Sequence, residues 1–202
     1  MPESLIPPHG GYRKLVTYRI GNLIYDATVA FCERYISRRD RTFDQMIQAA
    51  RSGVANIIEG SEASATSKKT ELRLTNVAKA SQEELLADYQ AFLRQRSLPE
   101  WSSDSPHAIT VRQSHPGNLA QLRQLMAALV SDLSDPSELS EKSDKNQLLA
   151  TVAANTMICL INQETFLLKH QIEALAADFE SAGGFSERLY RVRKAARNSK
   201  DE

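Results

Sequence analysis

The chain has 202 residues, of which 42% are hydrophobic and 25% are charged, which is enough apolar material for one sizeable core. Its 25 basic and 25 acidic residues give a formal net charge of zero, so overall charge favours neither nucleic acid nor a membrane surface as a partner. With only 8 glycines and 7 prolines, the composition argues against a turn-rich all-β protein.

The chain contains no run approaching the ~18 apolar residues that a membrane-spanning helix needs. Residues 1–15 contain no apolar run long enough for a signal peptide. Cys32 and Cys159 each lie in an apolar helical pattern, which favours two buried thiols in a reducing cytosol over a disulfide. We therefore expect a cytoplasmic protein without a membrane partner.

The prolines and glycines of residues 1–11 predict an irregular N-terminal arm. A first helix is expected from Tyr12 or Leu15 to Ile36, followed by the basic cluster Arg38, Arg39 and Arg41, whose charge suits a helix C-terminus. Its apolar face repeats at helical spacing. That face consists of Ile20, Leu23, Ile24, Ala27, Phe31 and Tyr35.

A second helix is expected over 42–60, with Thr42 and Gln45 forming a capping box and Gly60 a left-handed C-terminal cap. Small residues around Gly53 allow another helix to approach closely. A polar loop over 61–67 then leads to a third helix that ends near Arg96, before Pro99. The buried stripe of this third helix is expected to be Leu74, Ala78, Ser81, Leu85, Tyr89 and Phe92.

Residues 101–146 are interpreted as an insertion. We expect a loop over 101–118, a short amphipathic helix over 119–133 and a flexible linker over 131–145, which is rich in Ser, Asp, Glu and Lys. A fourth long helix should follow within 147–182. Its core candidates are Val152, Cys159, Phe166, Ile172, Leu175 and Phe179.

Gly183 and Gly184 should end that helix and begin a basic tail over 183–202, with a short helix starting at Ser186. Four long amphipathic helices, two short connections and one insertion predict an all-α, single-domain protein, an antiparallel four-helix bundle. Its first three helices would occupy 12–100.

Several segments resemble the four-helix-bundle suffix-domain proteins. They are HGGYR at 9–13, RTFDQMIQAARSGVANIIEGSEAS at 41–64, TSKKTELRLTNVAKAS at 66–81, EELLADYQAFLRQR at 83–96 and QETFLLKHQIEALAADFESAGGFSERLYRVRKAAR at 163–197. That group is similar to a wider superfamily. It includes the proteins encoded in ribosomal-RNA intervening sequences and the accessory protein of diversity-generating retroelements, and the shared core corresponds to 52–60 followed by 67–69.

The resemblance implies a four-helix bundle that assembles as a ring, commonly a homopentamer. For the retroelement accessory protein it implies binding of nucleic acid and of a reverse transcriptase through a basic surface. Within the shared pattern, Asn56, Glu59 and Gly60 are interpreted as a structural motif at the end of the second helix, where a buried polar side chain must find partners. A ligand-binding role for Asn56 and Glu59 is the less favoured alternative.

The residue patterns predict no enzyme, no catalytic residues, no metal site and no cofactor. No Glu is followed three residues later by His, as a di-iron bundle site requires. No Cys-x-x-Cys pair suggests zinc, and no Gly-rich phosphate loop is present.

The basic clusters are the main functional candidates. Arg38, Arg39 and Arg41 should lie at one end of the bundle, and Lys68 and Lys69 at the opposite end. The tail has six basic residues and one acid between Ser186 and Lys200. Its candidate nucleic-acid ligands are Arg188, Arg191, Arg193, Lys194 and Arg197.

We therefore expect a non-enzymatic homo-oligomeric scaffold that binds RNA, DNA or a nucleoprotein partner. Repetition in a ring would supply the several phosphate contacts on which nucleic-acid affinity depends. Solvated helix ends without a ligand remain the simpler interpretation of these clusters. A second hypothesis is a protein-interaction module without a nucleic-acid role, in which 119–145 recruits the partner. An unrecognised enzyme or small-ligand binder is the third.

Overall fold

The computed structural model describes residue 6, residues 9–134 and residues 142–198. Within this part of the chain all regular structure is helical, which confirms the all-α prediction. The elements are a 3-10 helix η1 (Tyr12–Lys14) and the α-helices α1 (Val16–Tyr35), α2 (Arg41–Ala63), α3 (Lys68–Gln95), α4 (Pro106–Ser114), α5 (Leu119–Leu133), α6 (Lys142–Ala182) and α7 (Phe185–Asn198).

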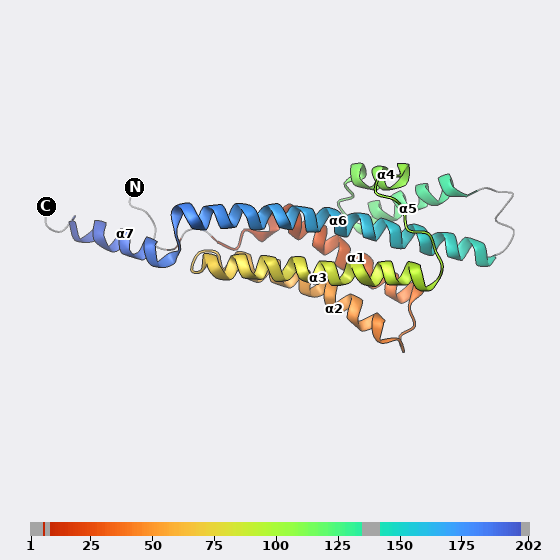
Figure 1. Cartoon of the computed structure of the whole chain (residues 1–202), viewed down its shortest axis with the longest axis horizontal. Coiled ribbons are helices and arrows are strands. Elements are labelled where there is room, and N and C mark those ends of the chain that lie inside the picture. The colour runs from red at the N-terminus through yellow and green to blue at the C-terminus, as the bar shows by residue number, and fades with distance from the viewer. Residues whose placement is uncertain (1–5, 7–8, 135–141, 199–202) are drawn as a thin grey trace.

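The four longest helices, α1, α2, α3 and α6, run along the long axis of the molecule (Figure 1). In the core, α2 packs on α1 and α3, and α6 packs on α3 and α1, so each contacts two neighbours. Phe31 lies at the centre of an aromatic cluster, with its ring centroid 4.8 Å from those of both Tyr89 and Phe92. The Tyr89 hydroxyl, which is fully buried, donates to Thr28 Oγ1 at 3.1 Å.

The prediction that Thr42 caps α2 is wrong. Asp40 occupies the N-cap, and its carboxylate accepts a hydrogen bond from the Thr42 N–H at 2.9 Å. A carboxylate is favoured at this position because it also interacts with the positive end of the helix dipole. The hydrogen bond lowers the pKa of Asp40, with a smaller contribution from Arg96.

The prediction that Gly60 ends α2 is also wrong, because the helix continues to Ala63. Gly60 is buried inside the helix where α3 passes close by. A Cβ atom at Gly60 would lie 3.4 Å from the Glu71 carbonyl oxygen and from Leu74 Cβ. The chain turns after Ala63 instead, and Ser67 caps α3 by accepting from the Thr70 N–H.

The loop predicted over 101–118 contains a helix, α4. Ser105 caps it by accepting from the Ala108 N–H, and Pro106 occupies the first turn, where a proline costs no hydrogen bond. Asn155 of α6 fixes the approach to this helix, since it accepts from the Trp101 N–H at 2.7 Å and donates to the Pro99 carbonyl at 2.9 Å.

The short helix predicted over 119–133 is confirmed as α5. The flexible linker predicted over 131–145 is wrong at both ends, because 131–133 belong to α5 and 142–145 to α6. The backbone hydrogen bonds of α5 continue to Leu133 and those of α6 begin at Lys142, although the polar composition of both ends predicted a linker. The rest of the predicted linker, 135–141, lies outside the described residues.

Every residue of α6 from 150 to 161 is buried. The physical reason is that α4 and α5 pack on the side of α6 that α1 and α3 leave uncovered (Figure 1). Of the predicted core residues, Val152 and Cys159 are buried as expected, and Ile172 and Leu175 are half-buried. Phe166 and Phe179, both predicted to be core residues, lie beyond the buried stretch and are 60% and 42% exposed.

Of the predicted N-terminal arm, 1–11, the structure describes only residues 6 and 9–11. Gly10 has a φ of +71° and its N–H donates to the Ser61 carbonyl at 3.3 Å, so this part of the arm lies on the end of α2. None of the helices in the described ranges combines the length and the apolarity that crossing a membrane requires.

Candidate nucleic-acid interface

One basic cluster lies at the turn between α1 and α2. Arg38, Arg39 and Arg41 are all exposed. Arg38 pairs with Glu33 at 3.6 Å, but both side chains are solvated, so this ion pair contributes little. Within the described part of the chain, Arg39 and Arg41 form no ion pair. Their charges are therefore available to an anion.

Arg96, at the C-terminal end of α3, joins this cluster. Its charge acts on Asp40, the N-cap of α2, and its guanidinium carbon lies 4.0 Å from the centroid of the Phe92 ring. Sequence analysis did not find this residue, because it lies far along the chain from Arg41. The signal that was missed is geometric: the end of α3 meets the start of α2 when the two helices are antiparallel neighbours.

Lys68 and Lys69 lie at the start of α3, and the structure distinguishes them. Lys68 Nζ lies 3.2 Å from carboxylate oxygens of both Glu71 and Asp178, so it links α3 to α6. Burial alone would lower the pKa of Lys68, but these two carboxylates outweigh it and the pKa is raised. The charge of Lys68 is thus compensated internally, whereas Lys69 is exposed.

The strongest concentration of positive charge is α7. It carries all five basic tail candidates against a single acid, Glu187, and none of its residues is buried. The Glu187 carboxylate accepts from the Gly184 N–H at 2.9 Å, and hydrogen bonds to backbone N–H groups lower its pKa. The helix extends beyond the end of the long helices (Figure 1).

The ten predicted basic candidates therefore do not form one site. Arg38, Arg39 and Arg41 lie at one end of α3, and Lys68, Lys69 and α7 lie at the other (Figure 1). A helix of 28 residues such as α3 is about 42 Å long, so one short stretch of nucleic acid cannot contact both ends of a single chain.

Asn56, Glu59 and Gly60 do not converge on a common site. Asn56 Nδ2 donates to the Ser52 carbonyl at 2.8 Å, and the Ser52 hydroxyl lies 3.0 Å from that of Ser81 on α3. Glu59 is exposed, and Gly60 is buried against α3. The contact between α2 and α3 here is made by Ser52 and Ser81, Asn56 reaches it only through Ser52 of its own helix, and Gly60 leaves room for α3 to pass closely.

The two cysteines are unpaired and buried, as predicted. Burial raises the pKa of Cys32 to about 12, with a smaller effect from Asp88, and it raises that of Cys159 to about 11. Neither thiol is therefore ionised near neutral pH, as an activated nucleophile would be. In the described ranges, no three His, Cys, Asp or Glu side chains are grouped in a way that suits a metal ion.

The fold and the basic clusters define an all-α protein with a projecting basic helix. Comparison of the chain with protein-family models gave no match, and searches of curated proteins and of solved structures gave no significant match either.

Proposed function

We propose that this protein is a non-enzymatic scaffold that binds nucleic acid or a nucleoprotein partner through its basic helix ends. We interpret α1, α2, α3 and α6 as an antiparallel four-helix bundle, with α4 and α5 as the insertion. The neighbour relations of the four helices support this assignment, as does the resemblance to suffix-domain proteins. The same resemblance supports a homo-oligomeric ring, commonly a homopentamer, and the residue patterns favour a cytoplasmic location.

The observation that carries this proposal is the exposed basic face of α7. Helical spacing puts Phe185, Leu189 and Val192 on one side, where they are half-buried, and puts Arg193, Lys194 and Arg197 among the exposed residues. An isolated helix of 14 residues is marginally stable in water, so phosphate contacts along its basic face would also stabilise it. Contacts to phosphates alone predict binding that tolerates changes of sequence.

Neutralising two α7 residues is expected to weaken nucleic-acid binding. Arg193→Gln with Arg197→Gln removes two exposed charges, so the slope of log K against log salt should become shallower by about two. The measurement is fluorescence anisotropy with labelled single-stranded RNA and duplex DNA between about 50 and 200 mM salt.

Two matched variants accompany this test. Arg19→Gln with Arg51→Gln removes two exposed charges outside both basic ends and should leave the slope unchanged. Arg39→Gln with Arg41→Gln reports on the other end of the bundle. Wild-type protein that shows no salt-dependent binding would contradict the proposal and favour the alternative, a protein-interaction module.

An exposed apolar hollow supports self-association. Its apolar walls are Val16 and Ile20 of α1 and Phe166 and Leu167 of α6, and its lining is completed by Arg112 of α4, His115, Asn162 and Gln163. Val16 is 48% exposed and Phe166 60% exposed, which is unusual for large apolar side chains close to each other. We propose that a second copy of the chain covers this hollow. In a ring of identical subunits, the same surface is buried against a neighbour on every subunit.

Phe166→Asp is therefore expected to reduce the solution mass. Wild-type protein should elute with the mass of several 22.5 kDa chains in light scattering, and the variant should shift toward a single chain, because the carboxylate cannot be buried without a partner. Tyr190→Asp, which replaces an exposed aromatic residue on α7, is the matched control. A monomeric wild type, or equal masses for wild type and Phe166→Asp, would exclude this contact surface.

If the insertion recruits a protein partner, deleting it would be the obvious test of the interaction-module alternative. The structure shows that this deletion is unsuitable. Because α4 and α5 bury α6 over 150–161, removing them would expose core residues and unfold the chain. Point substitutions on the exposed side of α5 are the suitable test of partner recruitment.

A further inference from the structure

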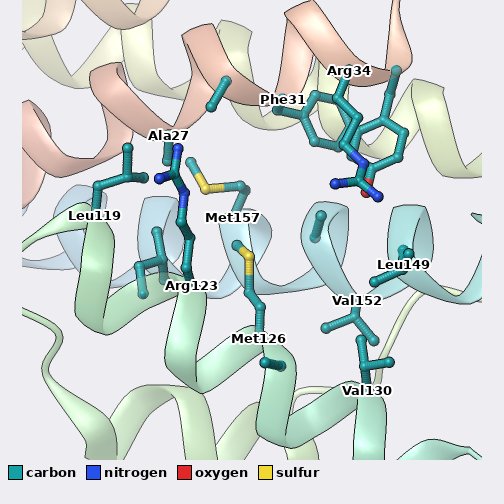
Figure 2. Close-up of a pocket in the computed structure, with 15 residues that line it drawn as sticks. Ala27, Phe31, Arg34, Leu119, Arg123, Met126, Val130, Leu149, Val152 and Met157 are labelled. Carbon is teal, nitrogen blue, oxygen red and sulfur yellow. The ribbon is translucent and has the colours of Figure 1, made fainter.

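A cavity of about 290 Å³ lies between α1, α5 and α6. Figure 2 shows that Met126 of α5 and Met157 of α6 project into its centre. Phe31, Leu122 and Val152 contribute further apolar walls. The cavity opens to solvent beside the exposed residues Arg34, Arg123 and Ala127, while most of its lining is apolar, so an apolar ligand would displace water from apolar surface on binding.

Two arginines lie at the cavity. Arg34 projects from α1 and Arg123 from α5, and in Figure 2 their guanidinium groups lie on opposite sides of the two methionines. The Arg34 guanidinium lies 5.4 Å from the centroid of the Tyr35 ring. Neither arginine forms an ion pair with a carboxylate in the described ranges. Both arginines are exposed and lie at the opening of the cavity, so apolar walls with two cations at the rim match a ligand with an apolar body and an anionic head.

We propose that this cavity binds a monocarboxylate with an unbranched apolar body, the chemistry of a medium-chain fatty acid. The volume is about twice that of the ~150 Å³ engineered cavity that accepts benzene, so it has room for about ten to twelve non-hydrogen atoms. The flexible side chains of Met126 and Met157 adapt to such a chain. The carboxylate forms a charge-assisted pair with Arg34 or Arg123. This site is independent of the basic face of α7.

The probe is decanoate, observed by NMR of protein labelled with ¹³C at the methionine methyl groups. Met126 and Met157 line the cavity, whereas Met46 is fully buried elsewhere in the core and serves as the internal reference. Decanoate is expected to shift the Met126 and Met157 signals saturably and to leave Met46 unchanged. 1-Decanol, which has the same chain length without the charge, should bind about tenfold more weakly.

Three variants complete the experiment. Arg34→Gln or Arg123→Gln should weaken decanoate binding about tenfold and leave 1-decanol binding unchanged, which identifies the arginine that holds the head group. Ala127→Phe, at an exposed position of α5, should fill the mouth and block both probes. Equal affinities for the two probes, a decanoate affinity that neither arginine variant changes, or equal shifts of Met46, Met126 and Met157 would each overturn the proposal.

Discussion

Replacing Glu164 by glutamine is expected to stabilise the protein near pH 8.5 and to change its stability little near pH 5. Glu164 lies on α6 and is fully buried, and neither of its carboxylate oxygens has a hydrogen-bond partner among the described residues. Its side chain lies against α1, because a Cβ atom at Gly21 would be 2.6 Å from Glu164 Oε1. Burial raises the pKa of Glu164 well above its usual value.

The direction of the pH dependence follows from this shift. In the folded state Glu164 stays protonated above pH 4.5, the ordinary pKa of a glutamate, while in the unfolded state it loses its proton there. Its contribution to stability is therefore fully present below the unfolded pKa and is lost as pH rises toward the folded pKa. Each pH unit within this window costs about 1.4 kcal/mol. Glutamine has the same shape as glutamate but does not ionise. The Glu164→Gln variant should therefore keep its free energy of unfolding as the pH rises.

The measurement is urea unfolding near pH 5 and near pH 8.5, followed by the fluorescence of Trp101, the only tryptophan of the chain. Glu180→Gln removes an exposed carboxylate from the same helix and should show no such pH-dependent gain. Both variants should be compared with wild type at equal protein concentration, since self-association would add to stability. A Glu164→Gln gain that is equal at the two pH values would contradict the assignment of Glu164 as a buried neutral acid.

Gly53→Ala is expected to destabilise the protein, whereas Gly60→Ala is not. Both glycines are buried in α2, and alanine improves helix propensity by about 1 kcal/mol at either position. A Cβ atom at Gly53 would lie 2.4 Å from Gln82 Nε2 and 3.1 Å from its Cδ, while at Gly60 the nearest atoms are at 3.4 Å, an ordinary contact. Gln82 is fully buried, and its Cγ would lie 3.3 Å from the new Cβ, so the whole side chain and not only its amide end has to shift.

The expected difference between the two variants is about 1–3 kcal/mol, the usual cost of overpacking a core, and the common gain in propensity cancels from it. Denaturant unfolding of both variants measures this difference. Gln82→Ala, combined with Gly53→Ala in a double-mutant cycle, should show a coupling free energy of at least about 1 kcal/mol, because it removes the clashing side chain. Equal free energies of unfolding for Gly53→Ala and Gly60→Ala would contradict the prediction. They would show that α2 and α3 can move apart near Gly53 at little cost in free energy.

The buried polar residues of these two predictions, Glu164 and Gln82, lie at similar heights along the long helices. Glu164 lies opposite Gly21, and Gln82 lies opposite Gly53. A Cβ atom at Gly21 would also lie 3.4 Å from Cγ2 of Val54, the residue that follows Gly53, so both polar side chains enter the core near the same turn of α2. The glycines leave the space that these long side chains occupy, which ties α1 to α6 and α2 to α3.

The sequence by itself determined the all-α class and the spans of α1, α3 and α5. Apolar residues at helical spacing and strong local caps such as Ser67 and Asn118 act within a few residues, so they are visible without a structure. The basic character of the tail is likewise a property of composition. The start of α4 at Ser105 and Pro106 was also a local signal, and it was missed because Pro106, together with Pro116 and Gly117, indicated a loop.

Only the tertiary structure decided which of these side chains are buried, which are exposed and which pair with one another. The insertion covers α6 over 150–161, which buries that stretch on every side and leaves Phe166 exposed beyond it. The packing of the long helices separates Arg41 from Lys68, lets Asp178 compensate Lys68, and brings Arg96 to Asp40. Each of these outcomes depends on residues far apart in the chain meeting across a helix interface, and no local spacing records such a meeting.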